Sequence, residues 1–79
     1  MKLVNFLNVT SDNTKVTMYK YMLENNEGYK LIVNNILLYS LLYCEEFTQY
    51  HNDTINFINI DGKDEVRIFL NATNKKEVL

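Results

Sequence analysis

Residues 1–79 form one domain at most, because a chain of this length buries little more than half of its unfolded surface around a single small core. Six Tyr and four Phe among many aliphatic residues supply enough apolar surface for folding without a metal ion or a disulfide, which argues against disorder. The net charge of −2, with no run of one sign, argues against a basic nucleic-acid binder and against a strongly acidic mimic of DNA.

The N-terminal segment predicts a short helix over residues 2–9. Leu3, Phe6 and Leu7 recur there at helical spacing, so they can share a face that covers one end of the core. Residues 10–14, Thr-Ser-Asp-Asn-Thr, form a cluster of turn formers, and we expect the helix to end at them.

A strand is predicted over residues 15–23, which are rich in β-branched and aromatic side chains. Val16 and Met18 lie on one face of this segment, and Tyr19 and Tyr21 lie on the other. This alternation indicates a strand rather than a helix.

The next segment completes a hairpin with that strand. Residues 24–28 form a polar loop that ends in glycine, which is available for a positive φ. A second strand is predicted over residues 29–33, where Tyr29, Leu31 and Val33 share one face.

Residues 36–50 predict the main helix of the chain, and Asn34 and Asn35 can cap its N-terminus through their side chains. One apolar stripe runs along this helix and is expected to be buried: Ile36, Tyr43, Phe47 and Tyr50, flanked by Tyr39 and Cys44. The remaining sides of the first two turns carry Leu37, Leu38, Leu41 and Leu42. One sheet face covers only one side of such a helix, so a patch rich in Leu and Tyr either remains exposed as an interface or is covered by the N-terminal helix and the tail. An exposed patch fits either a homodimer through helix 36–50 or a foreign partner.

The C-terminal half predicts a second hairpin. Residues 55–60 form a strand whose alternation breaks between Phe57 and Ile58, as happens at a bulge or under cover on both faces. Asp61-Gly62 is the strongest hairpin-turn signal in the chain, and residues 65–70 form the last strand.

The order of these elements predicts an α+β domain. We expect a short N-terminal helix and then ββαββ, with one main helix packed on a four-stranded, mostly antiparallel sheet. Residues 51–54 link the main helix to the second hairpin, and the polar residues 71–79 form a tail that we expect to fray.

The sequence offers little for catalysis. A metal site needs several converging ligands, but the chain has one His and one Cys, and Cys44 and His51 do not share a helix face. We interpret Cys44 as a small apolar residue of the buried stripe and His51 as a helix-end residue. Glu45 and Glu46 point about 100° apart on a helix and cannot face each other as an acid pair. We therefore expect no enzyme, no metal ion and no cofactor.

Membranes and nucleic acids are not expected as partners either. The longest apolar run, residues 36–44, is too short to span a bilayer, and residues 1–10 lack the pattern of a signal peptide. A single cysteine fits a reducing cytoplasm. Lys20, Lys30 and Arg67 are too few to surround the aromatic side chains of the strands as a nucleic-acid platform requires.

Composition and element order together carry a resemblance. Asn, Lys, Ile, Tyr and Phe make up 35 of the 79 residues, which indicates an A+T-rich gene. The apolar opening Leu3–Leu7, the turn-to-strand run Ser11–Thr17 and the closing hairpin Asp61–Leu70 complete the pattern. In size, composition and element order the chain resembles small accessory proteins of phages and prophages in low-GC Gram-positive bacteria, of the anti-CRISPR or host-takeover inhibitor type.

The resemblance implies a protein that binds a bacterial nucleic-acid enzyme, for example a CRISPR nuclease, and inhibits it sterically in the cytoplasm of the host cell. In that mechanism Tyr side chains act as anchors, and carboxylates pair with the basic groove of the target. The residues that we expect to bind the partner are Tyr39, Glu46 and Tyr50 on the main helix and Asp61, Asp64 and Glu65 on the second hairpin. The alternatives are a self-associating structural or adaptor protein and, less favoured, a nucleic-acid-binding module.

Overall fold

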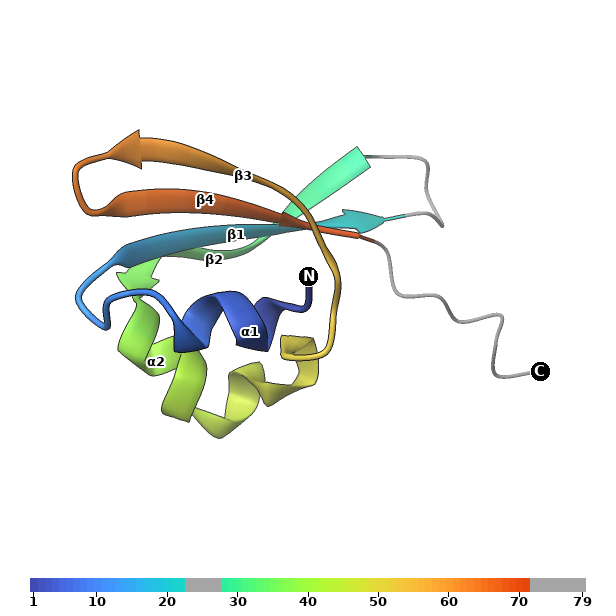
Figure 1. The fold of residues 1–79 in the computed structure, drawn as a ribbon. Helices are drawn as coiled ribbons and strands as arrows, with labels where there is room; N and C mark the ends of the chain where they lie inside the picture. The colour runs from blue at the N-terminus through green and yellow to red at the C-terminus, as the bar shows by residue number, and fades with distance from the viewer. Residues whose placement is uncertain (23–27, 72–79) are drawn as a thin grey trace.

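The computed structural model describes residues 1–22 and 28–71, in which a four-stranded sheet carries the helices on one face (Figure 1). The α+β class and the mostly antiparallel sheet are confirmed. The predicted loop over residues 24–28 lies outside the described residues except for its glycine, and the predicted tail over residues 71–79 lies outside them except for its first residue.

The described elements are, in chain order, α1 (Leu3–Asn8), β1 (Lys15–Met22), β2 (Gly28–Leu37), α2 (Leu38–Tyr43), the 3₁₀-helix η1 (Glu45–Tyr50), β3 (Ile55–Gly62) and β4 (Glu65–Leu70). The strands lie side by side in the order β2-β1-β4-β3. The pairs β1–β2 and β3–β4 are antiparallel hairpins, whereas the two central strands, β1 and β4, run parallel to each other.

The parallel central pair sets the path of the connection between the two hairpins. β2 ends at Leu37 beside Lys15, the first residue of β1, and β3 begins at Ile55 beside Leu70, the last residue of β4. Because β1 and β4 point the same way, these two positions lie at opposite ends of the sheet. The segment that joins them, α2 and η1, must therefore cross the sheet, and it does so on the face that α1 also covers (Figure 1).

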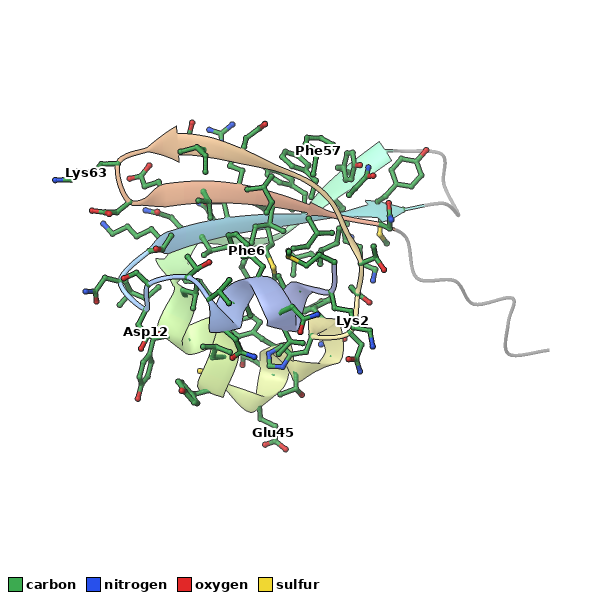
Figure 2. The ribbon with its side chains drawn as sticks, in the orientation of Figure 1. Lys2, Phe6, Asp12, Glu45, Phe57 and Lys63 are labelled. Carbon is green, nitrogen blue, oxygen red and sulfur yellow. The ribbon has the colours of Figure 1, made fainter. Side chains whose placement is uncertain are left out.

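The core lies between the helices and one side of the sheet, which we call the covered face. Its buried hydrophobic side chains are Leu3, Leu7, Val16, Met18, Val33, Leu38, Leu41, Val66, Ile68 and Leu70. Phe6 points from α1 toward the sheet and packs against this core (Figure 2). The alternation in β1 is confirmed, since Val16 and Met18 are fully buried while Tyr19 lies on the opposite side, the open face.

The start of α1 is held by main-chain hydrogen bonds instead of a side-chain cap. The Leu3 N–H donates to the Asp53 carbonyl oxygen (2.9 Å), and the Val4 N–H donates to the His51 carbonyl oxygen (3.0 Å). The first N–H groups of a helix have no partner within the helix and need one elsewhere. These bonds therefore fasten α1 to the segment that precedes β3.

The prediction of one continuous helix over residues 36–50 was wrong at its start. β2 runs on to Leu37, so Asn34 and Asn35 lie within the strand and do not cap a helix. Asn35 has a φ of 55°, and its N–H donates to the Thr17 hydroxyl oxygen (3.0 Å) at a shift in register between β1 and β2. Asn adopts this left-handed conformation more readily than most residues, so the strand continues through a bulge.

The same segment is interrupted again at Cys44, whose extended backbone (φ −84°, ψ 126°) separates α2 from η1. Cys44 is exposed, so its interpretation as part of a buried stripe was wrong. Leu38 and Leu41 of α2 are fully buried, and α1 packs against α2. The N-terminal helix thus covers these two leucines, as one of the two alternatives for this segment predicted, while the tail that the same alternative included lies outside the described residues.

The second hairpin turns two residues later than Asp61-Gly62 predicts. β3 runs on to Gly62, which pairs with Glu65, and Lys63 and Asp64 form the turn. The turn signal was therefore right about the hairpin and wrong about its position, because the strand pairing extends through the glycine.

A bulge explains the broken alternation in β3. The register with β4 shifts between Ile55 and Phe57, which leaves Asn56 without a partner in β4. Phe57 and Ile58 both pair in register, so Phe57 lies on the open face and Ile58 packs against the core. The bulge thus lies one residue before the position at which the alternation breaks.

The buried leucines of α2 predict a strong dependence of stability on side-chain size. Leu41→Ala should lower the free energy of unfolding by about 2–5 kcal/mol, because it leaves a cavity in the core. Chemical denaturation monitored by circular dichroism measures this loss. Tyr43→Ala, two positions along the same helix, is the control and should change stability by no more than about 0.5 kcal/mol. Equal losses in the two variants would contradict the packing described here.

The left-handed backbone of Asn35 gives a second prediction. Asn35→Val should lower the free energy of unfolding by about 1–2 kcal/mol, because a β-branched residue is strained at this φ, whereas Asn35→Gly should leave stability nearly unchanged. Asn34→Val, at the neighbouring exposed position with an ordinary φ, is the matched control. If valine were tolerated equally at both positions, β2 would not contain this bulge.

Candidate functional site

Four of the six predicted partner-binding residues lie at one end of the sheet, which we call the turn end. The turn end comprises Asp12 before β1, Tyr39 at the start of α2, and Asp61, Asp64 and Glu65 of the β3–β4 hairpin, all of them exposed. Main-chain hydrogen bonds join its segments, since the Lys15 N–H donates to the Asp64 carbonyl oxygen (2.7 Å) and the Tyr39 N–H donates to the Asp12 carbonyl oxygen (3.4 Å). Figure 2 labels Asp12 and Lys63 at this end of the molecule.

The turn end carries both signs of charge. Lys15, Lys63 and Arg67 lie among its carboxylates, and Arg67 Nη2 is 3.2 Å from Asp61 Oδ2. Asp12, Asp64 and Glu65 have no ion-pair partner among the described residues. The carboxylates therefore do not form a uniformly acidic face, but three of them are available to an external cation.

Two tyrosines form the aromatic part of this surface. Tyr39 and Tyr43 are 55% and 68% exposed, and their ring centroids are 4.9 Å apart on successive turns of α2. Leu37, at the end of β2, is also exposed next to them in the chain. Of the Leu- and Tyr-rich patch expected from the sequence, the two tyrosines and Leu37 are therefore exposed, whereas Leu38 and Leu41 are buried in the core.

The other two predicted residues lie elsewhere, on η1. Glu46 is exposed beside Glu45, which lies on the side of the helical layer remote from the sheet (Figure 2). Tyr50 is half-buried and packs against the core, with the Lys20 ammonium 5.8 Å from its ring centroid. The structure therefore groups Tyr39 with the hairpin carboxylates and separates Glu46 and Tyr50 from them.

A largely buried ion pair lies at the opposite end of the sheet from the turn end. Lys20 Nζ is 2.5 Å from Asp53 Oδ2, and the two side chains are only 14% and 15% exposed. An open cavity of about 330 Å³ adjoins it and is lined by Lys20, Met22, Lys30, Leu31, Ile32 and Tyr50. Asp53 neutralises the positive charge of Lys20, so Lys20 is not free to bind an anion in the cavity. The ion pair instead joins β1 to the segment before β3.

Five aromatic side chains from all four strands gather on the open face. Tyr19 and Phe57 stack on either side of Phe69, at centroid distances of 4.8 and 4.4 Å, and Tyr29 meets Phe69 edge-on at 5.1 Å. Tyr21 in turn meets Tyr29 edge-on at 5.3 Å. We call these five residues the aromatic cluster, and it acts as a second, smaller core.

The aromatic cluster also changes the shape of the sheet. Tyr29 and Phe57 belong to the two edge strands, yet their ring centroids are 6.0 Å apart, and the Asn56 amide donates to the Tyr29 hydroxyl. The sheet therefore coils at this end until its two edges approach each other, as the course of β2 past β3 shows (Figure 1). The rings pack partly against one another, and Phe57 at the edge of the cluster remains 45% exposed.

Cys44 and His51 are not joined as a nucleophile and its base. His51 Nε2 lies 2.8 Å from the Leu41 carbonyl oxygen, a contact that fastens the end of η1 to α2. In residues 1–22 and 28–71, no three side chains of His, Cys, Asp or Glu come together as ligands for a metal ion. Over the same described ranges, the helices are too short or too polar to cross a membrane.

The two ion pairs of the described chain should differ in their contribution to stability. Lys20→Met leaves the carboxylate of Asp53 buried and unpaired, and we expect a loss of about 2–3 kcal/mol in the free energy of unfolding. Arg67→Met removes the exposed pair with Asp61 and should cost at most about 1 kcal/mol. Urea titrations of the two variants measure the difference, and similar losses would show that the pair at Asp53 is as solvated as the surface pair.

Comparison with known proteins gives no match: no family model, no curated protein and no solved structure was found to be similar to this chain. Function is therefore inferred from the residues and their geometry.

Proposed function

We propose that this chain is a binding protein, not an enzyme, and that it sterically inhibits a bacterial nucleic-acid enzyme through the turn end and the tyrosines of α2. The observation that carries the proposal is the exposed pair Tyr39 and Tyr43 beside the acidic hairpin. Tyrosine buries a large area at a low cost in conformational entropy, and it is enriched at the centres of interfaces.

The carboxylates supply the complementary charge. Asp12 is joined to Tyr39 by a main-chain hydrogen bond, Asp64 and Glu65 lie at the same end of the sheet, and enzymes that act on nucleic acid present Lys and Arg along their grooves. Lys15 and Lys63 lie between these carboxylates, so the surface does not imitate the uniform negative charge of DNA. Each carboxylate would instead pair with an individual Lys or Arg of the groove.

The composition of the chain supports a low-GC Gram-positive host cell as the place of action, as does the resemblance to small phage and prophage proteins. A CRISPR nuclease is one candidate target of this kind. The protein would act in the cytoplasm, in a one-to-one complex that blocks the approach of nucleic acid to the target.

Two alternatives fit the geometry less well. A homodimer through residues 36–50 would use the leucines of that segment, but Leu38 and Leu41 are fully buried within the monomer. A nucleic-acid-binding module would need free aromatic faces and a basic surround, whereas the rings of the aromatic cluster pack against one another and the turn end carries carboxylates.

The proposal predicts capture of one bacterial nucleic-acid enzyme from lysate of a low-GC Gram-positive host, with the tagged protein as bait and mass spectrometry as readout. The purified target should lose its activity on nucleic acid when one equivalent of this protein is added. Tyr39→Ala/Tyr43→Ala should weaken binding at least roughly tenfold, because it removes the anchors.

Charge reversal locates the contact surface more closely. Asp64→Lys/Glu65→Lys should weaken binding to the captured enzyme, whereas Glu46→Lys on η1, equally exposed, is the matched control and should leave it unchanged. Loss of binding only in the control would move the interface to η1. Unchanged binding in both variants would contradict the groove-blocking mechanism.

A further inference from the structure

One edge of the sheet is open along most of its length. β3 is the last strand in the order β2-β1-β4-β3, and its outer side meets main chain only at its start, where the Ile55 N–H donates to the Met1 carbonyl oxygen (2.8 Å). Beyond that bond, the outward N–H and C=O groups of β3 have no main-chain partner among the described residues. Such a row of groups is a template for another extended strand.

The other edge strand carries the usual protection against this pairing, whereas β3 has bulges only near its two ends and is regular and uncharged from Phe57 to Ile60. β2 has an exposed lysine, Lys30, and the left-handed bulge at Asn35, both of which hinder the approach of another strand. Residues 55–60 of β3, Ile-Asn-Phe-Ile-Asn-Ile, contain no charge and no proline. Uncharged segments of this length with high β-propensity are the ones that pair with copies of themselves.

Apolar side chains flank the open edge on both faces of the sheet. Ile60, on the covered face beyond the helices, is 74% exposed, and Phe57, on the open face, is 45% exposed. A strand added along β3 would remove part of both side chains from water. The edge therefore offers hydrophobic contact as well as hydrogen bonds.

The charges at the two ends of β3 favour a second copy of the chain as the occupant. Exposed Lys2 pairs with Thr54, directly before β3, while Asp64, which has no ion-pair partner among the described residues, follows its far end next to Lys63; Asp61 is already paired with Arg67. In an antiparallel pair related by a two-fold axis, the start of one β3 meets the end of the other. Lys2 of each copy then approaches Asp64 of its partner, and no like charges face each other along the neutral middle of the strand.

We propose that two copies of this chain pair antiparallel through β3 about a two-fold axis and join their sheets into one continuous sheet. This interface lies on a sheet edge and does not use Tyr39 or Tyr43. It shares Asp64 with the proposed contact with a target enzyme, so Ile60→Lys and Tyr43→Lys, each of which alters only one of the two surfaces, tell the two proposals apart.

The test is analytical ultracentrifugation of the purified chain over a range of concentrations. The chain should sediment as a dimer that dissociates on dilution, and Ile60→Lys should raise the dissociation constant of the dimer at least roughly tenfold, because it places a charge on the edge. Leu31→Lys, on the edge strand β2 and 48% exposed, and Tyr43→Lys on α2 are matched controls that should leave dimerisation unchanged. Ile60 is largely exposed, so circular dichroism should show that Ile60→Lys remains folded.

Two further measurements identify the strand. Lys2→Glu should weaken the dimer, and Lys2→Glu/Asp64→Lys should restore it, because the exchanged charges again meet across the two-fold axis. Amide hydrogen exchange in residues 57–61 should slow as protein concentration rises. A chain that remains monomeric at every concentration overturns the proposal, and so does a dimer that is disrupted by Tyr43→Lys and not by Ile60→Lys.

Discussion

The parallel pairing of β1 with β4 is the constraint on which the rest of the structure depends. Each of these strands belongs to an antiparallel hairpin, so parallel alignment places the end of β2 and the start of β3 at opposite ends of the sheet. The chain must then cross the whole sheet between the hairpins, and α2 and η1 do so. The crossing segment carries Leu38 and Leu41 into the core on the covered face, where α1 packs against α2. One strand alignment thus accounts for the helical layer, its core and the separation of the turn end from the ion pair at Lys20.

Side chains on both faces of the sheet stabilise the fold. The covered face is aliphatic and sealed by helices, whereas the open face has no helix and protects itself by stacking its own rings around Phe69. Because both faces are used for stability, the surfaces that we propose for interaction lie elsewhere: at the turn end, on the exposed side of α2 and along β3. In a protein this small, little surface remains outside these two faces. Large hydrophobic side chains that are exposed there, such as Tyr43 and Ile60, are therefore candidates for contact with a partner.

Local patterns in the sequence were sufficient for the presence of four strands and for the class of fold, because the alternation of Val16 and Met18 with Tyr19 states directly which residues share a face. The prediction that Tyr29, Leu31 and Val33 share one face was wrong, because a shift in register between β1 and β2 places Val33 in the core and Tyr29 on the open face. Local patterns were also insufficient where one pattern suits two structures. Asn34 and Asn35 fit a helix cap as well as a left-handed bulge, and only the pairing of the following residues with β1 decides between them. The pair Lys20–Asp53 and the aromatic cluster depend on the register between distant strands, for which the sequence carries no local signal.

The parallel central pair has a consequence for the order in which the protein can form during synthesis. Residues of β1 pair with residues of β4 far along the chain, so the centre of the sheet closes only after nearly all the described residues have left the ribosome. The hairpin of β1 and β2 can form early, but β3 emerges before β4, the strand that will pair with it. During that interval both edges of the uncharged, β-prone segment 55–60 are unpaired. Nascent chains translated from one messenger RNA carry the same segment close together. Pairing with β4 covers one of these two edges, so completion of the last strand shortens the time for which the segment is exposed on both sides.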